Sequence, residues 1–143
     1  MSINDEGVTE YEYDEVIVEA NDAKEALLKG IVKLIDEYDT SDAVNSFCLG
    51  DQRMWLPLEE RKSMRQSLIA LKAMGVEEFT YWMGLIPITM PVEQFEQILN
   101  ALEVYALRCY NVTAMHKSEV MTMPIDDVVT YDYKAGYPDK LSF

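Results

Sequence analysis

The stretch that decides the fold is Phe79–Met123, FTYWMGLIPITMPVEQFEQILNALEVYALRCYNVTAMHKSEVMTM. Its first part is rich in aromatic and β-branched residues on either side of Gly84, which is the pattern of two strands joined by a turn. Pro91 does not suit a central strand, but it suits the start of a helix, where its missing N–H costs nothing. Apolar residues then recur every three or four positions, so we expect one long helix to about Met123.

The same pattern occurs once before in the chain, around Gly50. Residues 44–49 and 53–56 predict two strands around this glycine, followed by a helix that starts at Pro57 and ends before Gly75. At one constant offset Gly50, Pro57, Glu59 and Leu68 correspond to Gly84, Pro91, Glu93 and Leu102. We therefore predict an α+β fold in which two β-hairpin–helix units form a small antiparallel sheet covered by helices.

The N-terminal part is predicted to be an acidic arm over residues 1–20, followed by a helix over residues 21–38. Asp22 and Glu25 have the spacing of a capping box, and residues 11–18 have strand character. Leu28, Ile31 and Ile35 share one face of this helix, which packs either against its own domain or against another subunit. Asp39–Asp42 is turn chemistry, so the α+β core domain is expected over residues 39–143.

Charge is unevenly distributed in this chain, whose net charge is −14. Eight acidic residues precede the first basic one, Lys24, whereas residues 53–75 carry five basic residues against two acidic ones, a local net of +3. Such an acidic protein does not suit a nucleic-acid or anionic-membrane surface. We expect the acidic arm to dock on the basic face of the helix at 57–74 of a neighbouring subunit, through Arg61, Arg65 and Lys72, with Tyr11 and Tyr13 adding to a sheet edge.

The C-terminal segment 131–143 is rich in aromatic residues, which predict a tail that docks rather than a disordered one: Tyr131, Tyr133, Tyr137 and Phe143. The residues expected to contact other proteins are therefore Tyr11, Tyr13, Leu28, Ile31, Ile35, Arg61, Arg65, Lys72, Tyr137 and Phe143.

No residue pattern indicates catalysis, a cofactor or a metal ion. His116 lies on the apolar stripe of the long helix and is interpreted as a core or rim histidine, since no second ligand stands at metal spacing. Cys48 and Cys109 are interpreted as unlinked thiols, and Trp55 and Trp82 as sheet packing. Glu59 and Glu93 are interpreted as helix-start residues rather than as an acid–base pair, and the acids at 36–42 as a solvated turn.

From about Ile35 onward the chain resembles an uncharacterised domain family at the C-terminus of phage and prophage proteins of gut bacteria, associated with tails or tail fibres. The residues that carry the resemblance are 38–47, Met54-Trp55-Leu56, 102–106, 111–114 with His116-Lys117, and 136–143. The family has no assigned activity or catalytic residues, and the resemblance does not cover residues 1–34.

The resemblance implies a non-enzymatic structural or assembly module of a phage tail or virion. The expected partners are other copies of the chain in a homo-oligomer and other phage structural proteins. The alternative is an acidic phage-encoded accessory protein, an inhibitor that covers a basic host protein surface as a nucleic-acid mimic. With no apolar run of membrane-spanning length and an acidic start, we expect synthesis in the cytoplasm of the bacterial host and a final place there or in the virion tail.

Overall fold

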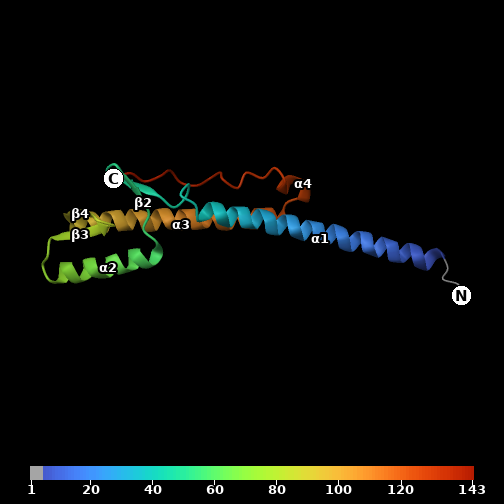
Figure 1. Cartoon of the computed structure of the whole chain (residues 1–143), viewed down its shortest axis with the longest axis horizontal. Coiled ribbons are helices and arrows are strands. Elements are labelled where there is room, and N and C mark those ends of the chain that lie inside the picture. The colour runs from blue at the N-terminus through green and yellow to red at the C-terminus, as the bar shows by residue number, and fades with distance from the viewer. Residues whose placement is uncertain (1–4) are drawn as a thin grey trace. The chain divides into compact units, whose positions relative to one another are not determined.

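The computed structural model describes the backbone of residues 5–143 and the side chains of residues 21–143. The elements follow in the order α1 (Asp5–Asp39), β1 (Phe47–Leu49), β2 (Gln52–Met54), α2 (Leu58–Ala73), β3 (Glu78–Met83), β4 (Ile86–Pro91), α3 (Val92–Thr122) and α4 (Ile125–Val128) (Figure 1). The predicted α+β fold class is confirmed.

The described chain forms two compact units, and the long helix α3 supplies residues to both. Unit 1 contains the chain up to Tyr38 together with Thr113–Ala135, and unit 2 contains Asp39–Val112 and Gly136–Phe143. The sequence placed all of residues 39–143 in one core domain. The structure instead groups 113–135 with the N-terminal helix.

Both predicted hairpins are present, with registers that match position for position between the two hairpins. Phe47 pairs with Met54 in the first hairpin, and Tyr81 pairs with Ile88 in the second. Gly50 and Gly84 have φ of 59° and 61° at the first position of their two-residue turns, which is where a type II′ turn carries glycine. Both turns are therefore confirmed, whereas the strands of the first hairpin are shorter than the predicted 44–49 and 53–56.

The two hairpins form two separate two-stranded sheets rather than one shared sheet. In the second hairpin exposure alternates strictly along β3, so that Phe79, Tyr81 and Met83 face inward and Glu78, Thr80 and Trp82 face solvent. The sequence shows which side of each hairpin is apolar. It does not show whether two short hairpins lie edge to edge, because that depends on contacts between distant residues.

Proline and glycine delimit α2 as predicted. Pro57 is the residue before the first helical one, and Gly75 follows the helix with φ of 74°, a backbone conformation that glycine adopts without strain. Glu59 lies in the first turn of α2 and Glu93 in the first turn of α3, where the helix dipole favours acidic side chains.

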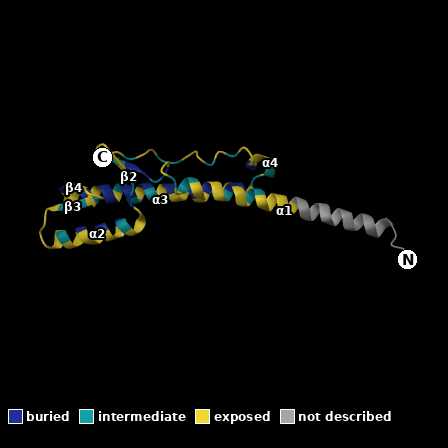
Figure 2. Cartoon of the chain, in the orientation of Figure 1, coloured by how far each residue is buried: buried dark blue, intermediate teal, exposed yellow. Residues whose placement is uncertain are grey.

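The core of unit 2 lies between α2, α3 and the inner faces of the hairpins. Its buried residues, dark blue in Figure 2, are Phe47, Leu56, Met64, Leu68, Met90, Val92, Phe95, Ile98, Leu99 and Leu102. Phe95 contacts the rings of Phe79 and Tyr81 edge-on, with centroids 5.0 and 6.5 Å away. The apolar stripe at the start of α3 thus holds the second hairpin in place.

The N-terminal prediction is wrong in one respect, because α1 is a single helix from Asp5 to Asp39. The expected strand at 11–18 is helical, and Asp22 lies inside the helix rather than at its start. This segment contains no proline between Asp5 and Asp39, and its acidic residues gather toward the helix N-terminus, where the macrodipole favours them. The strand signal of Tyr11, Tyr13, Val16 and Val18 is weak, because the spacing of three between Tyr13 and Val16 breaks the alternation.

Unit 1 has its own small core. Ile31 and Ile35 of α1 are buried with Val120 of α3 and Val128 of α4. Lys117 forms an ion pair with Asp36 between the two long helices of this unit. Of the two alternatives for the α1 face, packing within its own chain is therefore observed for Ile31 and Ile35, and Leu28 is partly buried beside them.

Candidate functional site

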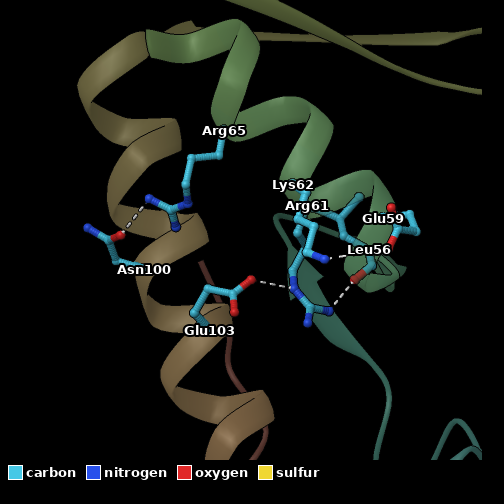
Figure 3. Close-up of polar contacts among 7 residues, drawn as sticks. All are labelled: Leu56, Glu59, Arg61, Lys62, Arg65, Asn100 and Glu103. Atoms are coloured by element: carbon cyan, nitrogen blue, oxygen red, sulfur yellow. Dashed lines mark hydrogen bonds and ion pairs between the residues drawn. The ribbon is translucent and has the colours of Figure 1, made fainter.

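The basic face of α2 is engaged by α3 of the same chain. Arg61 Nε donates to Glu103 Oε1 at 2.7 Å, and Lys72 Nζ contacts Glu96 Oε2 at 3.0 Å. Between them Arg65 Nη1 donates to Asn100 Oδ1 at 3.1 Å (Figure 3). Each of these three side chains thus has a partner on α3 of its own chain, while the side chains of the acidic arm that was expected to dock there lie outside the described residues.

The spacing of these partners explains why the two helices align. Glu96, Asn100 and Glu103 lie four and three residues apart, so they share one face of α3 and meet the basic face of the antiparallel α2. The sequence contained this signal. The local charge of residues 53–75 does not reveal these contacts, because the partner side chains belong to a polar stripe on α3.

Arg61 is the most deeply held of the three basic residues, with 6% of its surface exposed. Its Nη1 donates to the Leu56 carbonyl oxygen at 2.6 Å, and its guanidinium lies 5.4 Å from the centroid of the Trp55 ring. A guanidinium with several donors in one plane can satisfy a carboxylate and a carbonyl at once, which lysine cannot do in the same geometry. Arg61 is thus a structural residue, whereas its neighbour Lys62 forms an exposed pair with Glu59 at 3.6 Å.

His116 is buried and hydrogen-bonded, as predicted. Its Nδ1 is bonded to the Tyr131 hydroxyl, and its Nε2 lies 2.7 Å from the Ala135 carbonyl oxygen. Tyr131 also donates to Glu119, and Tyr133 packs edge-on against Tyr38. The aromatic tail therefore docks on its own chain in unit 1.

The end of the chain docks in unit 2 by adding to the first hairpin. Cys48 N–H donates to the Leu141 carbonyl oxygen at 3.0 Å, and Phe143 N–H donates to the Cys48 carbonyl oxygen at 2.8 Å. The ring of Phe143 packs edge-on against Phe47, with centroids 5.8 Å apart. Phe143 thus contacts its own chain, and Tyr137 is half-buried in the same segment.

Two basic residues beside this segment meet a buried serine. Lys140 Nζ donates to Ser46 Oγ at 2.7 Å and to the Asp42 carbonyl oxygen at 2.8 Å. Arg53 Nη2 donates to the same carbonyl oxygen at 3.1 Å. Desolvation, and then the charge of Arg53, lower the pKa of Lys140. These contacts join the tail to the loop that precedes β1.

The side chains of Tyr11 and Tyr13 lie outside the residues whose side chains are described. The remaining expectations concern the cysteines and the tryptophans. Cys48 and Cys109 are both free thiols, and burial raises the pKa of Cys109. Trp55 packs as predicted, 6.0 Å from Tyr105 and 6.4 Å from Phe47 between ring centroids. For Trp82 the packing interpretation is wrong, because 60% of its surface is exposed on the outer face of β3.

Trp82 belongs to a set of exposed apolar side chains of unit 2, which we call the hairpin surface. It comprises side chains from the second half of α2, the following loop and the outer face and tip of the second hairpin: Ile69, Met74, Val76, Trp82 and Leu85. Leu85 at the hairpin tip is 95% exposed and Met74 is 81% exposed. The alternation along β3 already placed Trp82 opposite the inward set, so its exposure was available from the sequence.

Within residues 21–143, no group of three or more potential metal-ligating side chains lies close enough to hold an ion. Over the same residues, none of the helices is both long and apolar enough to cross a membrane. Fold and surface together define an α+β helix–hairpin protein with an apolar outer surface. Comparison with protein-family models, with curated proteins and with solved structures finds no match for this chain.

Proposed function

We propose that this chain is a non-enzymatic structural or assembly module of a phage tail or virion, which acts through protein–protein contacts. The observation that supports it best is the hairpin surface, where five large apolar side chains of α2, the following loop and the second hairpin are exposed. Several large apolar side chains exposed on neighbouring elements commonly mark a site of association. The phage context is supported by the resemblance of residues 38–47 and 136–143 to a tail-associated domain family.

Contacts within the chain direct the proposal toward this surface. The sequence predicted partner contacts at the basic face of α2 and at the aromatic tail. In the structure α3 of the same chain contacts this face of α2, and β1 pairs with the end of the tail. Within residues 21–143, the hairpin surface holds the two most exposed large apolar side chains, Leu85 and Met74. Partner residues that are apolar and aromatic would gain most from it.

The test is mass spectrometry of purified, salt-washed phage particles that encode this chain. We expect the chain in the particles at a fixed ratio to known structural proteins, retained at high salt because apolar contacts are not screened. A chain found only in the soluble lysate would overturn the proposal. If it is found there with a basic host protein that it releases at high salt, the acidic accessory alternative is favoured.

A matched pair of variants connects the surface to assembly. Met74→Ser removes an exposed side chain of the hairpin surface, whereas Met121→Ser removes an exposed methionine of α3 in unit 1. We expect Met74→Ser to reduce incorporation into particles and Met121→Ser to leave it unchanged. Equal incorporation of both variants would exclude Met74 from the partner contact.

A further inference from the structure

The molecule itself shows how the edge of one of its hairpins is occupied. In a hairpin closed by a two-residue turn, the residues flanking the turn form a hydrogen-bonded pair, and the next pair directs its N–H and C=O groups outward. Leu49 and Gln52 flank the first turn, so Cys48 is in the outward class. The tail uses both outward groups of Cys48 and lies parallel to β1.

The corresponding edge of the second hairpin is β3. Trp82 is the counterpart of Cys48 when Gly84 is aligned with Gly50, and it is next to the pair Met83–Ile86 that flanks the turn. By the same rule the outward residues of β3 are Glu78, Thr80 and Trp82. Within residues 21–143, no other segment forms a backbone hydrogen bond with these three residues.

The opposite edge of the hairpin is blocked. The outward positions of β4 are Pro87, Thr89 and Pro91, and the two prolines have no N–H to donate. Prolines on an edge strand prevent a further strand from pairing with it. Of the two strands of this hairpin, only β3 therefore has a backbone N–H donor and a C=O acceptor at each of its outward positions.

A groove follows the first half of the β3 edge, with α2 as its other wall. It has a volume of about 600 Å³, and its lining includes Ser67, Ala70, Met74, Val76, Glu78 and Thr80. Neighbouring strands lie about 4.8 Å apart, while packed helices lie about 8–10 Å apart, so a two-stranded sheet is too narrow to cover both α2 and α3. The side chains of Ser67, Ala70 and Met74, at the C-terminal end of α2, therefore line the space beside the unpaired edge of β3.

We infer that the β3 edge and this groove accept an extended segment of a partner protein, which adds a strand beside Glu78, Thr80 and Trp82. A second copy of β3 does not suit the groove, because its own helices would have to enter the space that α2 occupies. The segment we expect alternates apolar residues, which face the α2 wall, with polar ones. It carries basic residues, because Glu77 and Glu78 are exposed beside the groove.

This inference rests on the proposed role in protein–protein contacts, and it names the surface and the form of the partner. The tail that pairs with β1 is a template for that form, since its sequence Lys140-Leu141-Ser142-Phe143 is basic, apolar, polar and aromatic in turn. A suitable probe is the capped hexapeptide Lys-Val-Thr-Val-Lys-Phe. Its counterpart with both lysines replaced by glutamate is the charge control.

The experiment measures backbone amide exchange by NMR in the full chain, with and without the probe. We expect exchange of the Thr80 and Trp82 amides to slow roughly tenfold near saturation, while the Thr89 amide on the opposite edge is unchanged. The glutamate peptide should give no protection. Unchanged exchange at Thr80 and Trp82 with saturating probe would overturn the inference, even if the chain is found in particles.

Two variants separate the edges. Thr80 and Thr89 are opposite each other, and their hydroxyl oxygens lie 2.8 Å apart, so Thr80→Pro and Thr89→Pro lose the same side-chain bond. Each removes one outward N–H and no ladder bond between β3 and β4. We expect Thr80→Pro to abolish peptide binding and Thr89→Pro to retain it.

A control on the peptide keeps the test valid if either variant fails to fold. Two versions of the probe, N-methylated on alternate sets of residues, should differ in binding to the wild-type chain, because only one edge of the peptide pairs with β3. Equal binding of the two versions would contradict strand addition. A concentration-dependent dimer of the wild type that Thr80→Pro dissociates would overturn the choice of occupant in favour of a second copy.

Discussion

At the scale of single residues, Arg61 is a buried charge that holds the structure together, whereas Lys62 beside it is a surface charge. Arg61→Ala leaves the Leu56 carbonyl oxygen and the Glu103 carboxylate without their donor, so we expect the free energy of unfolding to fall by about 2–4 kcal/mol. Lys62→Ala on the same helix removes only an exposed pair and should cost less than about 1 kcal/mol. Urea unfolding measures both, and equal losses would contradict a structural role for Arg61.

Tyr81 should make stability depend on alkaline pH. Desolvation, and then the hydrogen bond that its hydroxyl donates to Glu60, raise the pKa of Tyr81 to about 12 from the ordinary 10.0. The unfolded chain therefore releases this proton first as pH rises, so the stabilising contribution is complete below pH 10 and is lost between pH 10 and about 12.

The measurement is unfolding by urea at a series of pH values from 9 to 12, for the wild type and Tyr81→Phe. The wild type should lose more stability across this window than the variant, which lacks the ionisable hydroxyl. Parallel curves for the two proteins would show that Tyr81 ionises alike in the folded and unfolded chains.

At the scale of elements, two glycines should respond in opposite ways to the same substitution. Gly84 has φ of 61° and Gly30 is in the middle of α1, and a Cβ would meet nothing within 4 Å at either position. Gly84→Ala should destabilise by about 1 kcal/mol through backbone strain alone. Gly30→Ala should stabilise by about 0.5–1 kcal/mol, because alanine favours the helix. Melting temperatures of the two variants on opposite sides of the wild type would confirm this.

The hairpins could be predicted because their signals are local. The turns followed from Gly50 and Gly84. The inward faces followed from the alternation of apolar and polar residues along the strands, and the ends of α2 followed from Pro57 and Gly75. The helix over 11–18 was not predicted, because tyrosines and valines spaced two and three residues apart suggest a strand as readily as one flank of a helix. The partners of Arg61 and Lys72 lie 42 and 24 residues away, and such pairs require knowing which faces of α2 and α3 meet.

The same limit applied to the candidate site. Exposure of Trp82 followed from its place in the β3 alternation, but the groove beside Thr80 did not, because its second wall is α2. Because the registers of the two hairpins match, their edges can be compared position for position. The tail that occupies one of them and leaves the other free became visible only in the structure.

At the scale of the whole molecule, the two cores should be separable in unfolding. The buried cluster around Leu99 lies in unit 2, and the cluster around Ile35 lies in unit 1. Trp55 and Trp82 are the only two tryptophans and both belong to unit 2, so tryptophan fluorescence reports on that unit, while far-UV circular dichroism reports helices of both.

Leu99 and Ile35 are both fully buried, so truncation of either to alanine should cost about 2–5 kcal/mol in its own unit. Leu99→Ala should lower the urea midpoint seen by fluorescence. Ile35→Ala should leave that midpoint in place and lower only part of the circular dichroism transition, because the lost side chain does not belong to the unit 2 core. If Ile35→Ala lowers the fluorescence midpoint as far as Leu99→Ala does, the continuous helix α3 couples the two cores into one cooperative unit.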